Sequence, residues 1–206
     1  MMLWLGIAML LAGFALLAVD RKAAHYFRAH LPVPLLRFAI RTTDLAKGGP
    51  WIISVVVLYL AVQAWMEFSG VTPLARQLSD IALALLASLV AGSVVLHSVK
   101  IFLGRRRPRD DFEHGLYGFL FFTWDLQYNS FPSGHALTIF SVAVWSSALA
   151  PFLWPLWMAF AVYLALTRAL LTSHFLSDVT IGGGIGVIAT REVLVRFFPQ
   201  FTPFWF

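Results

Sequence analysis

Six mainly apolar stretches divide this sequence, and each is close to the length of a membrane-spanning helix. A transmembrane helix takes about 20 mostly apolar residues. Only 12% of the 206 residues are charged, whereas a soluble domain has about 25%. We therefore predict an all-α fold, a polytopic membrane helix bundle with about six transmembrane helices, as a single domain over residues 1–206. The six stretches are residues 1–19, 50–67, 80–103, 134–151, 153–172 and 175–196.

The remaining segments fit this layout. The first stretch has neither a basic start nor a clear small-residue cleavage site, so we interpret it as a retained helix rather than a signal peptide. Over residues 20–49, apolar residues alternate with cations, which is typical of helices that lie at the membrane interface. The sequence has no cysteine, which excludes disulfides and thiolate nucleophiles.

Three short polar clusters interrupt the apolar sequence. Ionisable side chains are costly inside a membrane, so such clusters indicate function. The clusters are Lys100 to Arg107-Pro108, then Pro132-Ser133-Gly134-His135, then Arg168 with His174 and Asp178. If the last four apolar stretches all span the membrane, the three clusters lie on the same side of it.

Each of the first two clusters could bind an anion. Lys100 and Arg107 are seven residues apart, about two helical turns. We therefore expect them to project from nearly the same face of the third helix, which Pro108 would end, and to clamp a phosphate. The alternative is that both side chains reach out to lipid headgroups. At Ser133 and Gly134, backbone N–H groups at a helix start favour an anion, although an ordinary helix cap is the alternative.

The third cluster has the spacing of a nucleophile and the group that orients it. His174 and Asp178 are four residues apart and would be neighbours on a helix. A carboxylate that accepts one ring N–H leaves the other nitrogen free to attack. The alternative is a solvated pair at a helix start. Arg168 would point elsewhere on a continuous helix, but a turn near Thr172-Ser173 would bring it to His174.

Taken together, the clusters resemble the three signature motifs of the type 2 phosphatidic acid phosphatase superfamily, over a motif core of residues 100–178. The six-helix layout resembles the integral-membrane branch of that family. One position departs from the family pattern, because Thr167 stands where a serine is usual. The resemblance implies a metal-independent phosphatase without a cofactor.

The resemblance also implies a role for each motif residue. His174 would attack phosphorus to form a phosphohistidine, with Asp178 holding its ring. His135 would protonate the departing oxygen and later help to activate water. The oxygens of the phosphate would be stabilised by Lys100, Arg107, Ser133, the backbone amide of Gly134, and Arg168.

The expected reaction is hydrolysis of a lipid phosphate or diphosphate, with a membrane lipid and the bilayer as partners and no nucleic acid. Plausible substrates are undecaprenyl diphosphate, phosphatidylglycerophosphate, phosphatidic acid and the lipid A phosphate. A lipid phosphotransferase that uses the same histidine is one alternative, and a non-catalytic lipid-binding or transport protein is another. Binding alone needs no nucleophile, so the two histidines and the aspartate argue against the last. The sequence determines neither the lipid nor the oligomeric state.

Two arguments about orientation disagree. The resemblance implies a bacterial inner membrane with the active site facing the periplasm. Six Lys and Arg residues between Arg21 and Lys47 instead place this face in the cytoplasm, because basic loops tend to stay inside. We give the resemblance more weight, since these cations can serve anionic lipids.

Other conspicuous residues have simpler explanations. We expect His97 to hydrogen-bond to a neighbouring helix. Gly182 and Gly186 fit close helix packing. Three arginines beside the first cluster either select headgroups or form a solvated basic loop: Arg105, Arg106 and Arg109.

Overall fold

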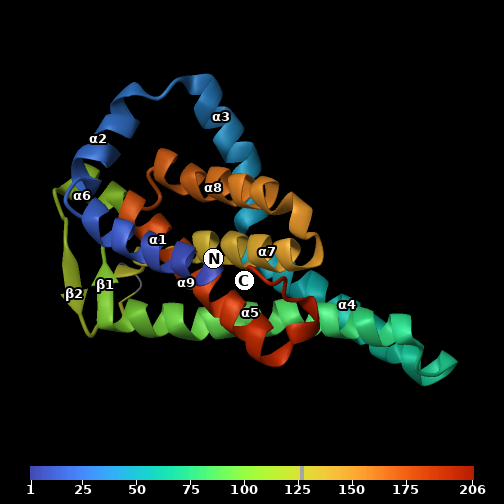
Figure 1. Ribbon diagram of the computed structural model, residues 1–206. Coiled ribbons are helices and arrows are strands. Elements are labelled where there is room, and N and C mark those ends of the chain that lie inside the picture. Colours follow the sequence, from blue (N-terminus) through green and yellow to red (C-terminus); the bar gives the residue numbers. More distant parts are fainter. Residues whose placement is uncertain (126–127) are drawn as a thin grey trace.

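The computed structural model describes residues 1–125 and 128–206 as a bundle of helices with a small two-stranded sheet at one end (Figure 1). The segment expected at the interface forms α2 (Asp20–His30), α3 (Val33–Thr42) and the 3-10 turn η1 (Thr43–Ala46). Each of the six apolar stretches corresponds to one α-helix, although some helices extend beyond the predicted bounds, so the predicted helical class is confirmed. These helices are α1 (Met2–Leu16), α4 (Gly48–Ser69), α5 (Pro73–Phe102), α7 (Gly134–Leu149), α8 (Trp154–Leu170) and α9 (Leu176–Phe197).

Fewer of these helices are long and apolar enough to span a membrane than the sequence predicts. By length and composition, three helical segments of the described chain could cross a membrane, and a bent pair, α1 with α2, would make four. Helix α7 is apolar but shorter. The predicted total of six spans is therefore not confirmed. The three segments are Val33–Ser69, Pro73–Phe102 and Pro151–Leu170, the last of which includes the short turn η3 (Pro151–Leu153).

The first polar cluster does not lie on one helix, contrary to the prediction. Helix α5 ends at Phe102, and the chain continues as β1 (Leu103–Arg105), which pairs antiparallel with β2 (Phe119–Phe121). The hairpin donates backbone N–H groups to the carbonyls of Ile101 and Phe102, which the helix end would otherwise leave without partners. Between the strands, Pro108 begins α6 (Pro108–His114) instead of ending α5, because proline fits the first position of a helix.

Helix α9 lies at the centre of the bundle and packs against α1, α5 and α7. Its glycines allow this approach. A Cβ atom added at Gly182 would overlap the backbone carbonyl of Ser133, and one at Gly186 would overlap that of Leu137. The predicted close packing at these two glycines is confirmed, and it brings the start of α9 against the start of α7.

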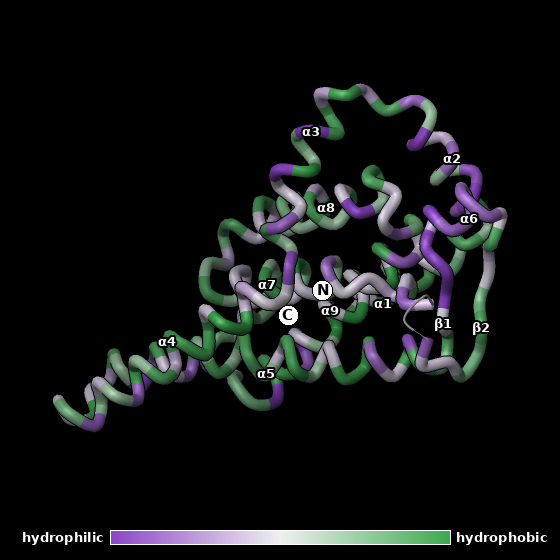
Figure 2. The backbone as a smooth tube through the Cα atoms, turned by 180° about the vertical axis from the view of Figure 1, so that it is seen from behind, coloured by the Kyte–Doolittle hydropathy of each residue, from purple (hydrophilic) through white to green (hydrophobic). Residues whose placement is uncertain are grey.

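The two ends of the bundle differ in polarity. Hydrophilic positions gather over α2, α6 and β1, beside the C-terminal end of α5 (Figure 2). The turn between α4 and α5 projects at the opposite end (Figure 1). The chain termini meet near the middle, where the amino group of Met1 donates to the carbonyl of Trp205 at 2.8 Å, after the last turn, η4 (Pro199–Phe201). The polar end is therefore where a site for a charged substrate can lie.

Candidate active site

The three polar clusters meet at the polar end of the bundle, as predicted. Ser133, the residue before α7, donates its backbone N–H to the carbonyl of Asp178 at 2.9 Å. This contact joins the second cluster to the third. The charged neighbours of His135 include Arg107, Arg168 and His174 from the other two clusters, together with Lys47.

A turn brings Arg168 and His174 together at the end of α8, and this confirms the prediction for Thr172-Ser173. Thr172 has a φ of 52°, in the left-handed region that reverses a chain. The backbone N–H groups of Ser173 and His174 then donate to the carbonyl of Arg168 at 3.0 and 3.2 Å. The turn places His174 just outside the start of α9.

The ring of His174 is held differently from the prediction. Its Nδ1 lies 2.8 Å from the backbone carbonyl of Ser130 and 3.7 Å from Oδ2 of Asp178. A carbonyl only accepts hydrogen bonds, so Nδ1 carries the proton and Nε2 keeps its lone pair. Ser130, rather than Asp178, is therefore the direct acceptor. The sequence analysis missed Ser130, although it lies just before the second cluster.

The carboxylate of Asp178 is fully buried and has several donors. Its Oδ2 accepts the hydroxyl of Ser130 at 2.6 Å and the backbone N–H of Phe175 at 2.9 Å. Its Oδ1 accepts a guanidinium N–H of Arg105 at 2.7 Å. Asp178 thus caps α9 and positions Ser130, which in turn holds His174.

Arg105 is neither solvated nor free to select headgroups, so both interpretations of it are wrong. Its side chain is 0% exposed, and it pairs with two carboxylates, Asp178 at 2.7 Å and Asp20 at 2.9 Å. Its guanidinium carbon lies 4.1 Å from the centre of the Phe175 ring. The physical reason is the strand that replaces the end of the predicted helix, because it turns residue 105 towards the start of α9.

Several polar atoms at the site are buried without a hydrogen-bond partner among the described residues. Three of them are Oγ of Ser133, Nε2 of His135 and Nε of Arg168. A buried polar atom left unpaired costs about 1–3 kcal/mol, so their gathering in one place favours a bound group with several acceptor oxygens. Arg168 also donates from Nη1 to the hydroxyl of Thr43 at 3.1 Å, which orients its guanidinium.

Cations beside His174 affect its protonation. Burial lowers the pKa of His174 below its ordinary value, and the charges of Arg107 and Lys100 lower it further, while Asp178 opposes the shift. Lys100 is itself held by the carbonyl of Asn129, to which its ammonium donates at 2.9 Å. The imidazole of His174 is therefore neutral near pH 7, the form in which Nε2 is a nucleophile.

A cavity of about 260 Å³ lies between α4, α5 and α7 and borders the site at His135. Gly134 and His135 line one part of it, and the rest of the lining includes apolar side chains such as Leu96 and polar ones such as Thr138. His97 also lines it, but its Nδ1 contacts the carbonyl of Ser93 at 2.8 Å in its own helix. The expectation of a partner on a neighbouring helix is therefore wrong.

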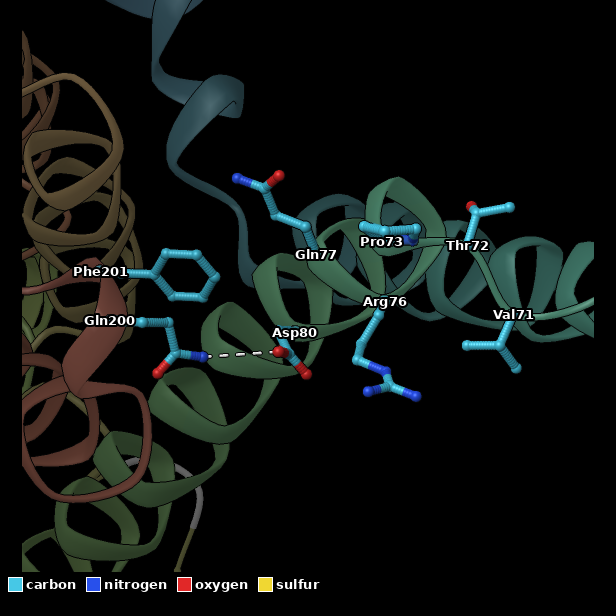
Figure 3. Close-up of a pocket in the computed structure, with 8 residues that line it drawn as sticks. All are labelled: Val71, Thr72, Pro73, Arg76, Gln77, Asp80, Gln200 and Phe201. Atoms are coloured by element: carbon cyan, nitrogen blue, oxygen red, sulfur yellow. Dashed lines mark hydrogen bonds between the residues drawn. The ribbon is translucent and has the colours of Figure 1, made fainter.

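A larger cavity, of about 510 Å³, lies at the other end of α5 beside the turn from α4 (Figure 3). Arg76, Asp80 and Gln200 line it, and Gln200 donates to Asp80 at 3.4 Å. It contains none of the motif residues. Within the described part of the chain, no three His, Asp or Glu side chains are grouped so that they could hold a metal ion; independence of metals stays a prediction.

The fold defines an integral-membrane helical protein in which the three polar clusters meet around His135 and His174. A family model described as the PAP2 superfamily matches residues 81–201, more than half of the chain. The chain therefore belongs to the PAP2 superfamily, and the predicted resemblance is confirmed.

Two curated relatives and two solved structures are similar to the chain. The lipid A 1-phosphatase of Rhizobium etli is 30% identical over 125 residues, 59% of this chain and 54% of the relative. That of Rhizobium johnstonii is 30% identical over 112 residues, 54% of this chain and 46% of the relative. The chain thus spans about half the length of these relatives.

The solved structures agree with the fold over most of the chain. LpxE of Aquifex aeolicus superposes with a TM-score of 0.56 at 21% identity, covering 87% of this chain and 94% of LpxE. The transmembrane PAP2-type phosphatidylglycerolphosphate phosphatase of Bacillus subtilis gives 0.57 at 17% identity, covering 97% and 98%. These comparisons show the fold alone.

Proposed function

We propose that the protein is a membrane phosphatase that hydrolyses a lipid phosphate or diphosphate through a phosphohistidine at His174. The observation that supports this most directly is the state of the His174 ring. The Nδ1–H of His174 donates to the carbonyl of Ser130 at 2.8 Å, so Nε2 is left as a nucleophile beside the cations Lys100 and Arg107.

In the first step, Nε2 of His174 attacks phosphorus and the bond from phosphorus to the lipid oxygen breaks. His135 gives a proton to that oxygen, and the negative charge of the bound phosphate favours the protonated imidazole that this requires. The transition state places charge on the equatorial oxygens, where fixed donors stabilise it. The donors are Lys100, Arg107, the hydroxyl of Ser133, the amide of Gly134, and Arg168.

In the second step, water attacks the phosphohistidine and inorganic phosphate leaves. His135, now neutral, accepts a proton from the water, which is the reverse of its first role. No metal or cofactor takes part in either step. Asp178 remains a carboxylate throughout and acts through Ser130.

A lipid substrate is supported by the cavity between α4, α5 and α7. Its apolar part lies next to His135, so an acyl or prenyl chain could remain in an apolar environment while the phosphate reaches the cations. The named activities of the relatives suggest lipid A 1-phosphate and phosphatidylglycerophosphate as substrates to test first. The bacterial sources of these relatives support a bacterial membrane. The inner membrane, with the site facing the periplasm, is the location that we propose.

Phosphate release by the purified protein in detergent tests the proposal. Lipid A, phosphatidylglycerophosphate, undecaprenyl diphosphate and phosphatidic acid would each be supplied in excess EDTA. We expect turnover of at least one, because cations of the protein stabilise the phosphate. Loss of activity in EDTA with recovery on adding magnesium would contradict the mechanism. Transfer of labelled phosphate from the substrate to a second lipid instead of to water would identify a phosphotransferase.

The nucleophile is tested by acid-quenched trapping of labelled phosphate on the protein. His174→Ala should remove both the trapped phosphate and turnover. His135→Ala should keep a nucleophile but slow departure of the lipid, because proton donation contributes about 10²–10⁴-fold. Label that persists in His174→Ala would assign the nucleophile to another residue.

A further inference from the structure

Arg105 occupies a buried position between two carboxylates that come from distant parts of the chain. Its Nη1 lies 2.7 Å from Oδ1 of Asp178 and 2.9 Å from Oδ2 of Asp20. The same nitrogen donates to the hydroxyl of Ser177 at 2.8 Å, and Nη2 donates to the hydroxyl of Tyr117 at 2.9 Å. The side chains of Arg105, Asp20 and Asp178 are all 0% exposed, so Arg105 and Asp20 are shielded from solvent and substrate.

Asp20 joins the start of α2 to the start of α9. Its Oδ1 accepts the backbone N–H of Ser177 at 3.0 Å, and its Oδ2 accepts the hydroxyl of the same residue. Negative charge at a helix N-terminus is favourable, but a buried carboxylate also requires a compensating charge. Arg105 supplies that charge to Asp20 and Asp178 at once.

A continuous series of contacts leads from this pair to the nucleophile. Asp178 uses Oδ1 for Arg105 and Oδ2 for the hydroxyl of Ser130. The carbonyl of Ser130 then holds Nδ1 of His174 at 2.8 Å. If Asp178 rotated or became protonated, it would no longer accept the hydrogen bond of Ser130. The His174 ring would then lose its orientation.

We propose that Arg105 and Asp20 are positioning residues, which keep Asp178 an oriented carboxylate so that Ser130 can hold the nucleophile. This inference rests on the proposed function. The simpler alternative is a structural link between α2 and α9 that has no effect on the chemistry. The two differ in how activity should depend on pH.

The pH argument follows from the charges around Asp178. Without Arg105, Asp20 and Asp178 face each other with no cation between them, and two such carboxylates resist joint ionisation. One then takes up a proton as the pH falls, and protonation of Asp178 would stop it accepting from Ser130. Activity should therefore be lost at a higher pH than in the wild type. The titratable or charged groups that face the buried pair are His174, Lys100, Arg107 and, through Arg105, Tyr117.

The test measures kcat and KM against pH, with a substrate that the wild type hydrolyses, for Arg105→Met, Asp20→Asn and the double variant. For Arg105→Met we expect kcat to fall about 10- to 100-fold with KM within about threefold, since only orientation is lost. The acid limb of the kcat–pH profile of this variant should move up by about one pH unit or more, because the negative charges of Asp20 and Asp178 now oppose each other. The double variant removes one of the charges, so its acid limb should return towards that of the wild type. Arg109→Met, on the adjacent helix α6 and 70% exposed, is the matched control.

Other results would overturn the inference. An Arg105→Met enzyme of unchanged pH profile and kcat would reduce the pair to a structural link. A KM raised with kcat unchanged would indicate direct substrate binding. If Arg105→Met does not accumulate in the membrane, Arg105→Lys and Asp20→Asn replace it, and both should lower kcat at constant KM. Wild-type kcat in both would also overturn it. Failure of the wild type on every lipid would instead remove the proposed function.

Discussion

Ser130 determines which nitrogen of His174 is available for chemistry. Its carbonyl accepts from Nδ1 at 2.8 Å, while its hydroxyl donates to Asp178 at 2.6 Å. One residue therefore links the nucleophile to the buried carboxylate. This arrangement makes the effect of Asp178 on His174 indirect. Asp178→Asn should disturb the ring by displacing Ser130 rather than by removing a direct partner.

The protonation of His174 can be predicted with its sign. Burial lowers the pKa of His174 in the folded protein. In the unfolded chain the same ring has the ordinary pKa of about 6.5, so it takes up a proton at a pH where the folded protein keeps the ring neutral. The stability that this provides is complete above pH of about 6.5 and is lost as the pH falls through the folded value. We expect ¹⁵N NMR of labelled histidine to show a titration midpoint below 6.5 and a proton on Nδ1. His174→Gln assigns the signal, and a proton on Nε2 would contradict the proposed nucleophile.

At the scale of elements, contact between α7 and α9 sets the geometry of the site. The start of α7 carries Ser133 and Gly134, and the start of α9 carries Asp178. Gly182 allows the two backbones to touch, because a Cβ atom there would overlap the carbonyl of Ser133. The hydrogen bond between the N–H of Ser133 and the carbonyl of Asp178, at 2.9 Å, depends on this approach.

Gly182→Ala should therefore separate the two helices. We expect a loss of about 1–3 kcal/mol in the free energy of unfolding, the usual effect of overpacking, together with loss of phosphate release. Thermal unfolding in detergent measures the first effect. Gly49→Ala on α4 is the matched control, because a Cβ atom there meets nothing within 4 Å and alanine favours a helix. Equal stability of both variants would show that the approach at Gly182 is not required.

At the scale of the whole molecule, the basic segment 20–49 lies on the same face as the site. Arg21 forms two hydrogen bonds to Asp111 of α6, at 2.8 and 2.9 Å, and Thr43 contacts Arg168. Part of the positive charge in this segment is therefore paired within the protein. A paired cation is a weaker signal for a cytoplasmic loop than a free one, so the charge count is a weaker argument for a cytoplasmic site.

Cysteine labelling decides the orientation, since the chain has no cysteine of its own. Glu113→Cys, at an exposed position of α6, should react with a membrane-impermeant thiol reagent in intact cells or spheroplasts. Val71→Cys, at the turn between α4 and α5 and 60% exposed, should react only after lysis. The reverse pattern would place the active site in the cytoplasm and show that the charge count was the better guide.

The sequence alone determined the helices and most of the candidate site. Helix positions follow from runs of apolar residues, which are local features of the chain. The predicted turn at Thr172-Ser173 and the close packing at Gly182 could be inferred because a turn and a small residue have local signatures. The three clusters converge because alternate ends of successive helices meet on one side.

Only the tertiary structure decided the environment of Arg105, the acceptor for His174 and the end of α5. Arg105 lies 73 residues from Asp178, and Asp20 lies 157 residues from Ser177. No local pattern specifies such pairings. Helix α5 ends at Phe102 because a later strand, β2, pairs with the residues that follow. The local sequence is the same whether an arginine lies in a solvated basic loop or is buried between two carboxylates. Only contacts between distant segments distinguish the two cases.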